Sequence, residues 1–185
     1  MKKLFTLLAL LGVTFTAMAD EGMWLLPYIK KMNSKDLKAH GAKIKAENII
    51  YIASRDIDEG EAEIIRQYNI PVFHMHEIVA EGIDKTIRRI EKHLKNLVAS
   101  KIYLSIDIDV IDPQLAPGTG VPVPNGIDRD MLFKFIDVII NTGRVKGAEL
   151  VEVNPTLDDG NNTTTLLAID IVDYLVRKIL ENSID

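Results

Sequence analysis

The feature that most constrains the fold of this chain is an alternation of apolar, β-branched runs with segments of helical periodicity. The runs cover residues 48–53, 71–75, 101–106 and 148–153. Their apolar character is nearly continuous rather than alternating, which is typical of strands buried on both faces of a sheet. A chain of 185 residues suits one modest domain.

Helical periodicity fills the intervals between these runs. We expect helices over residues 59–68, 77–97, 128–141 and 163–180, and a further short one over residues 34–40 that stops at Gly41. Asp128 is placed as an N-cap, and Gly143 lies where a helix should stop. Strands that alternate with helices pair in parallel, so the sequence predicts a three-layer α/β fold with a mainly parallel sheet. Ligands of such sheets bind beyond the carboxyl ends of the strands.

Charge and cysteine content exclude several classes of function. The formal net charge is -5, so there is no basic surface for a nucleic-acid partner. The chain contains no cysteine, which excludes disulfides, thiolate nucleophiles and zinc-sulfur sites.

The first 19 residues have the pattern of a secretory signal peptide. Lys2 and Lys3 precede an apolar run over residues 4–15, and Ala17-Met18-Ala19 supplies a cleavage site. The alternative is a buried helix. The run is too short to span a bilayer, and no later stretch is long enough. We therefore expect export to the periplasm or the extracellular space, with no membrane attachment after cleavage.

Two aspartates follow the third predicted strand. If the extended conformation continues, Asp107 and Asp109 share one face, because alternate residues of a strand point the same way. Two adjacent carboxylates repel each other unless a cation or a proton compensates, and oxygen ligands suit hard divalent ions such as manganese or magnesium. The simpler alternative is that both acids cap turns.

The surrounding sequence resembles the ureohydrolase superfamily, and within it arginase more than agmatinase. The resemblance rests on the segments 105–113 (SIDIDVIDP), 116–124 (APGTGVPVP), 151–158 (VEVNPTLD) and 51–61 (YIASRDIDEGE), and it extends over residues 47–185. Residues 20–46 instead resemble the beginning of exported serine dipeptidyl peptidases, without any of their catalytic residues.

The arginase resemblance implies a role for each matching acid. Asp107 and Asp109 would bind manganese, of which the family holds two ions, and Glu152 would receive the guanidinium group of arginine or a related guanidino compound. Asp58 and Glu61 would recognise the α-amino end of arginine. The alternative for Asp58 and Glu61 is that they complement the dipole of the helix that follows. The implied reaction converts arginine to ornithine and urea by attack of metal-activated water.

Some elements of the family pattern are not found in this sequence. The remaining metal ligands of the family come from a Gly-Gly-Asp-His and an Asp-x-His-x-Asp segment, and neither occurs here. His74 and His76 end a strand and are an alternative pair of ligands. Val121 replaces a threonine and Asn125 a glycine of the family. The Arg-Glu pair of the family's subunit contacts is not present around Asp130, which leaves a homo-oligomer as an open alternative.

Two functions of different class follow. The first is a manganese-dependent amidinohydrolase, impaired by the missing ligands. The second is a noncatalytic arginase-like remnant, or a module that binds metal or arginine weakly, with apolar surface exposed to association. A peptidase is a third and weaker alternative, because only the N-terminal segment supports it.

Overall fold

The computed structural model describes residues 46–182, and in this range strands alternate with helices as the sequence predicts. The predicted signal peptide, the helix over residues 34–40 and the peptidase-like segment up to residue 45 lie outside the described residues. The strands are β1 (Tyr51–Ser54), β2 (Val72–His74), β3 (Ile102–Asp107) and β4 (Val145–Val151). The helices are α3 (Glu59–Tyr68), α4 (Met75–Glu81), α5 (Ile83–Asn96), α6 (Arg129–Ile140) and α7 (Thr163–Glu181), with short 3-10 turns η1 (Ala46–Asn48) and η2 (Ile108–Val110).

All pairing between these strands is parallel, which confirms the predicted α/β class. β1 pairs with β2 and β3 pairs with β4, so the described strands form two separate two-stranded sheets. In the second sheet Asp107 stands opposite Val151, the residue before Glu152. The carboxyl ends of β3 and β4 therefore place Asp107 and Glu152 beside each other.

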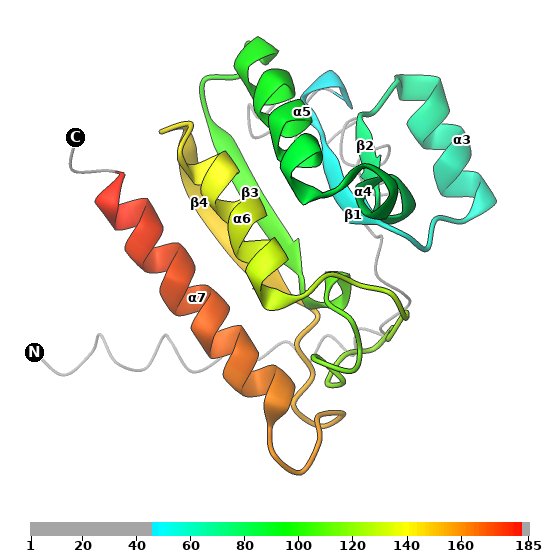
Figure 1. The fold of residues 1–185 in the computed structure, drawn as a ribbon, viewed down its shortest axis with the longest axis vertical. Helices are drawn as coiled ribbons and strands as arrows, with labels where there is room; N and C mark the ends of the chain where they lie inside the picture. Colours follow the sequence, from blue (N-terminus) through cyan, green and yellow to red (C-terminus); the bar gives the residue numbers. More distant parts are fainter. Residues whose placement is uncertain (1–45, 183–185) are drawn as a thin grey trace, which may run out of the picture.

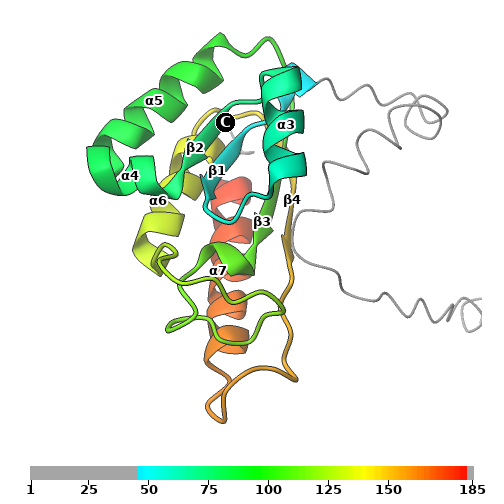
Figure 2. The same ribbon diagram turned by 90° about the vertical axis from the view of Figure 1, so that its right-hand side faces the viewer.

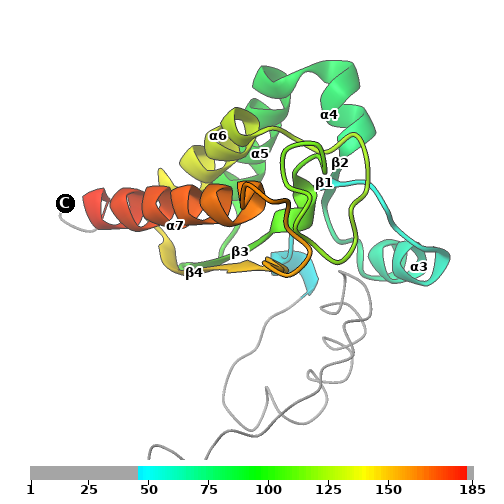
Figure 3. The ribbon, with the colours of Figure 1, turned by 90° about the horizontal axis from the view of Figure 1, so that it is seen from below.

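Helices cover the two strand pairs differently. α4 and α5 lie on one side of β1 and β2, and α3 lies on the other, so this part has three layers (Figures 1 and 2). α5, α6 and α7 all lie on the same side of β3 and β4 (Figure 3). The opposite face of β3 and β4 is not covered by a described helix.

The core lies between β3 and β4 and the helices on their covered side. α6 contributes most to it, because nearly its whole sequence RDMLFKFIDVII is apolar after the first turn. Each of these side chains stabilises the fold by roughly 1.5–3 kcal/mol when fully buried. The buried residues of α6 are Leu132, Phe133, Phe135, Ile136, Val138, Ile139 and Ile140, and they pack with Ile106, Ile108, Ile171 and Leu175.

Three expectations about this architecture are corrected. β3 and β4 are not buried on both faces: Tyr103 is 64% exposed, and its hydroxyl donates to the exposed carboxylate of Glu149. The predicted helix over residues 77–97 is two helices, because Gly82 adopts a φ of 83° between them. β4 begins at Val145 and ends at Val151, so it starts and ends earlier than the predicted strand.

Within residues 46–182, no helix combines the length and the apolar character needed to cross a bilayer.

Candidate functional site

Asp107 and Asp109 lie at the carboxyl end of β3, but they do not converge by continuing the strand. β3 ends at Asp107, and the chain turns at once into η2, which contains Asp109. A carboxylate oxygen of Asp107 accepts a hydrogen bond of 2.9 Å from the main-chain N–H of Asp109. The first aspartate thus caps the turn that carries the second, which is one of the roles that the sequence left open for such acids.

The carboxylate of Asp109 has an unusual environment. Both of its oxygens are buried, and neither forms a regular hydrogen bond with a described residue. Burial, together with the nearby charges of Asp107 and Glu152, raises the pKa of Asp109 to about 7. Arg55 and the nearby N–H of Val121 oppose this rise. A buried carboxylate without partners is costly unless a proton or a cation compensates its charge.

The carboxylate of Asp107 shares this environment in part. Burial raises its pKa to about 6, against the N–H of Asp109 and the charge of Arg55, which lower it. Glu152 also raises the pKa of Asp107 through its negative charge. Asp107, Asp109 and Glu152 therefore form one electrostatically coupled group of acids.

Glu152 is the first residue after β4 and has a φ of 63°, in the left-handed region. The predicted strand over residues 148–153 places Glu152 inside an apolar strand end, and this is wrong. Its side chain is exposed, since the strand ends one residue earlier. Such a backbone conformation costs free energy in a residue other than glycine, and it directs Glu152 away from the regular course of the strand.

Asp58 and Glu61 form a capping box at the start of α3. Asp58 accepts a 2.7 Å hydrogen bond from the N–H of Glu61, and Glu61 accepts a 3.0 Å bond from the N–H of Asp58. Burial raises the pKa of Glu61, with Asp56 and Asp58 as the neighbouring charges. The structural role that we held open for these acids is thus present, while their substrate role remains a prediction.

Arg55 is the residue at this site whose role we did not predict. It follows β1, is half-buried, and donates hydrogen bonds to main-chain carbonyls of the turn after β3 and of Val123. No salt bridge joins it to an acid within residues 46–182, although it lies close enough to Asp107 and Asp109 to lower their pKa values. Its position directly after a strand was the one signal in the sequence.

The loop after η2 returns against the turn and was also missed. Asp112 accepts hydrogen bonds from the N–H groups of Gln114, Asn125 and Gly126, which hold the pKa of Asp112 below its usual value. Asn125 has a φ of 64°, a conformation that glycine adopts freely and asparagine tolerates. At Gly126 a Cβ atom would lie 2.4 Å from the nitrogen of Asp112. Only glycine therefore lets the loop pack this closely.

His74 and His76 are a stacked pair, with ring centroids 5.2 Å apart. His74 is the N-cap of α4 and makes no side-chain capping bond. No group of three or more histidine, cysteine or acidic side chains suited to a metal ion occurs among residues 46–182. The pair therefore gains no third ligand from this part of the chain.

The donor set at Asp107 and Asp109 fits a hard divalent cation in kind, but not in number. Carboxylate oxygens are ligands that manganese and magnesium accept, and the unpartnered oxygens of Asp109 would gain a partner from such an ion. Two residues are too few for a closed site, so the described residues supply part of a coordination shell.

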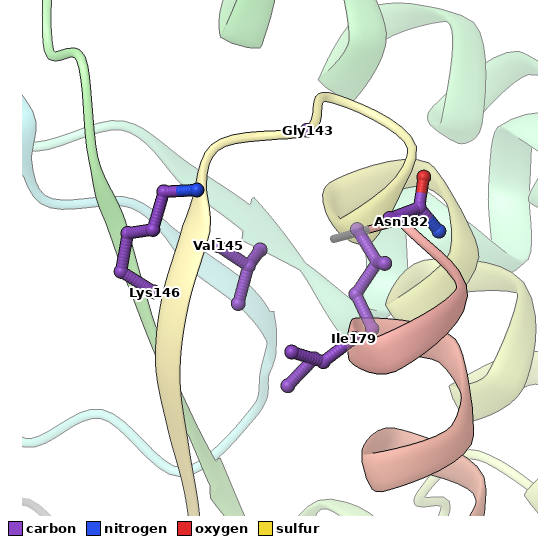
Figure 4. A pocket seen from close by; sticks show the side chains of 6 residues that line it. Gly143, Val145, Lys146, Ile179 and Asn182 are labelled. Atoms are coloured by element: carbon purple, nitrogen blue, oxygen red, sulfur yellow. The ribbon is translucent and has the colours of Figure 1, made fainter. Parts of the chain in front are cut away.

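Two hollows of the surface lie away from these acids. Figure 4 shows one at the start of β4, lined by Gly143, Val145, Lys146, Ile179 and Asn182 among others. Its volume is about 10 Å³, which is room for about one water molecule. A larger groove of about 370 Å³ lies between α5 and α6. Both are at the amino end of β4, opposite the candidate site, so they do not mark it.

Comparison with known proteins points to one family. Residues 22–177 match the sequence profile of the Arginase family. The match thus begins within the segment that we compared with dipeptidyl peptidases. The arginase of Bacillus subtilis is 37% identical over 145 residues, which are 78% of this chain and 48% of that protein.

Solved arginase structures have the same fold as the described part. The Helicobacter pylori arginase aligns with a TM-score of 0.70 at 28% identity, over 81% of this chain and 49% of that one. The Entamoeba histolytica arginase, solved in complex with L-ornithine, aligns with a TM-score of 0.64 at 29% identity, over 72% of this chain and 44% of that one. The chain spans about half the length of the relatives it matches.

Proposed function

Because this chain belongs to the arginase family, we propose that it carries part of a manganese-dependent amidinohydrolase site for arginine. Asp107 and Asp109 are the proposed metal ligands, and Glu152 is the proposed acceptor of the guanidinium group. The products would be ornithine and urea. We propose, and do not observe, the activity of a whole arginase for this chain, because the match covers about half the length of its relatives.

The environment of Asp109 is the observation that carries this proposal. A carboxylate with two buried oxygens and no regular hydrogen bond, beside two further acids, is poorly stabilised as an anion. A divalent cation between Asp107 and Asp109 would offset this cost, and neither acid is neutralised by a salt bridge within the described residues. When bound, manganese supplies Lewis acidity that activates water for attack on a guanidino carbon.

Glu152 suits the substrate role by chemistry and by place. Its exposed carboxylate stands beside Asp107 at the strand ends, so a cation approaching from solvent can reach it. A carboxylate binds the planar guanidinium group through two parallel hydrogen bonds, which orient the group as well as hold it. Asp58 and Glu61 are the proposed acceptors of the α-amino group of arginine.

A noncatalytic arginase-like protein that binds metal or arginine weakly is the second candidate. It is favoured by the absence, within residues 46–182, of any group of three or more side chains suited to a metal ion. Catalysis needs fixed coordination and supporting groups around the ligands. We therefore propose that hydrolysis by this chain alone is impaired.

Urea release from arginine tests the two candidates. The purified chain is incubated with manganese and arginine, beside an Asp107→Ala, Asp109→Ala double variant and with agmatine as a second substrate. Turnover that requires both aspartates and favours arginine supports the amidinohydrolase. Binding of manganese or arginine without release of urea supports the noncatalytic protein. If the chain binds neither, both candidates are contradicted.

We also propose that the chain is exported by residues 1–19. Mass spectrometry of the protein expressed in a bacterium would then find a mature form that begins at Asp20. A form that retains residues 1–19 would contradict export through this segment.

A further inference from the structure

Arg55 connects two segments of the candidate site through main-chain carbonyls. Its Nη1 donates to the carbonyl of Val110 at 3.2 Å, and its Nη2 donates to the carbonyl of Asp109, with a longer contact of 3.5 Å to Ile111. On the other side, Nε and Nη2 donate to the carbonyl of Val123 at 3.2 and 2.8 Å. One side chain from the end of β1 thus holds the turn after β3 against the following loop.

Arg55 bonds to the backbone of Asp109 and not to its side chain. Arg55 bonds to the carbonyl of Asp109, while both carboxylate oxygens of the same residue remain without a regular hydrogen bond. An arginine that paired with the carboxylate would neutralise it and block a cation. Held by its main chain instead, Asp109 keeps its carboxylate available and its orientation fixed.

We propose that Arg55 is a positioning residue of the candidate site, which fixes the orientation of Asp109 by clamping η2 to the loop at Val123. The metal part of this inference rests on the proposed function, whereas the clamp itself does not. Arginine suits the task because its planar group directs five N–H donors in fixed directions. A lysine at this position could donate from only one point.

A second arginine provides a matched control at the opposite end of β4. Arg144 is half-buried and donates to the main-chain carbonyls of Leu97 and Ala99 at 3.1 and 2.9 Å and of Leu94 at 2.5 Å. It makes the same kind of contact, but with the end of α5, away from Asp107 and Asp109. Arg144→Ala therefore reports the general cost of removing a half-buried arginine from this fold.

Amide hydrogen exchange of the full metal-free chain, followed by NMR, tests the clamp directly. The informative amides are those of Asp109, which donates to Asp107, and of Asp112 and Ile127, which join the turn to the loop. In Arg55→Ala these amides should exchange on the order of tenfold faster, relative to amides in α6, because several bonds to a charged donor are lost. Arg144→Ala should leave this ratio unchanged. Equal acceleration of the site amides and the α6 amides in Arg55→Ala would overturn the proposal.

Arg55→Lys covers the case in which the alanine variant does not fold. It keeps the charge and most of the stem, but it cannot bond to both segments at once, so the site amides should again exchange faster than those of α6. Manganese titration of the same proteins gives a second measurement. Affinity should fall about 10- to 100-fold in the Arg55 variants and stay unchanged in Arg144→Ala. A wild-type chain that binds no manganese contradicts the proposed function, while the exchange ratios still decide on the clamp.

Discussion

The carboxylate of Asp107 accepts a 2.9 Å hydrogen bond from the main-chain N–H of Asp109, so the first candidate ligand shapes the turn that presents the second. The bond uses one oxygen of Asp107 and none of the side chain of Asp109. A short side-chain cap therefore brings two negative charges together at the carboxyl end of β3. The two acids and Glu152 form a site that needs compensating positive charge.

Stability of the metal-free protein should fall as the pH rises from about 4 to about 7. Burial raises the pKa of Asp107 to about 6 and of Asp109 to about 7, from a usual 3.8. In this window the folded state holds protons that the unfolded state has released, so increasing pH favours unfolding. This contribution is lost as the pH rises through the folded-state pKa of Asp109, which is about 7.

Chemical denaturation at a series of pH values checks this prediction. In Asp109→Asn the part of the decline nearest pH 7 should disappear, since the titrating group is removed and the shape is kept. The background from other groups cancels in the difference between wild type and variant. An unchanged pH dependence in the variant would show that Asp109 titrates normally.

Gly126→Ala should destabilise the protein by about 1–3 kcal/mol, because a Cβ atom at this position overlaps the main chain of the turn. The contacts are with backbone atoms of Val110, Ile111 and Asp112, at 2.4–2.7 Å, and the backbone cannot move aside as a flexible side chain would. Gly120→Ala is the control, since a Cβ atom there meets nothing within 4 Å. Denaturant unfolding measures both, and equal effects would contradict the close packing of the loop.

Two substitutions of Asp58 separate capping from substrate binding. Asp58→Ala should cost about 1 kcal/mol, because the N–H of Glu61 loses its acceptor. Asp58→Asn should leave stability nearly unchanged, since asparagine caps as well, but should weaken the binding of arginine through the lost charge. Calorimetric titration with arginine measures that affinity. If Asp58→Asn keeps it intact, Asp58 is a cap and no more.

Because α7 exposes apolar side chains on its outer face, we expect the chain to associate with a second copy of itself. An apolar row runs along this helix, and its five side chains are 45–61% exposed: Leu166, Ile169, Val172, Val176 and Leu180. Asp173 and Arg177, each 60% exposed, flank the row. In an antiparallel pair of α7 helices, the acid of one copy would face the base of the other, which favours self-pairing.

Sedimentation over a range of protein concentrations tests this association. Ile169→Ser with Val176→Ser should reduce it by breaking the row. Val79→Ser with Val98→Ser removes two exposed valines that lie outside α7, 71% and 97% exposed, and should leave it unchanged. A wild-type chain that stays monomeric at every concentration would contradict the prediction.

Elements with local signals were predictable from the sequence. α3 begins as expected because Asp58 and Glu61 form a capping box within four residues, and it ends as expected before Asn69, which has a φ of 51°. α6 begins after Asp128, whose side chain accepts a hydrogen bond from the N–H of Met131. The break at Gly82 was missed, since the apolar periodicity continues across it and a single glycine is tolerated in many helices. Burial on both faces of β3 was misjudged, because an apolar run does not show what covers each face.

The candidate site was predictable in its members and less so in its geometry. The strand-end position of Asp107 and Asp109 indicated that they lie close together, but the turn that achieves this depends on one hydrogen bond. Arg55 was missed because its partners are main-chain carbonyls 54–68 residues away. Every residue has a main-chain carbonyl, so the residue types do not show which carbonyls accept a hydrogen bond. Long-range contacts of this kind have to be seen in the structure.

Calorimetric titration of the full chain with manganese tests the central claim most directly. Wild type should bind the ion, and Asp107→Asn with Asp109→Asn should abolish binding while the fold is kept. Asp130→Asn is the control for lost negative charge, because the side chain of Asp130 is 82% exposed. It should bind manganese as wild type does. A wild-type chain without measurable binding, or equal binding by the double variant, would contradict the assignment of Asp107 and Asp109 as metal ligands.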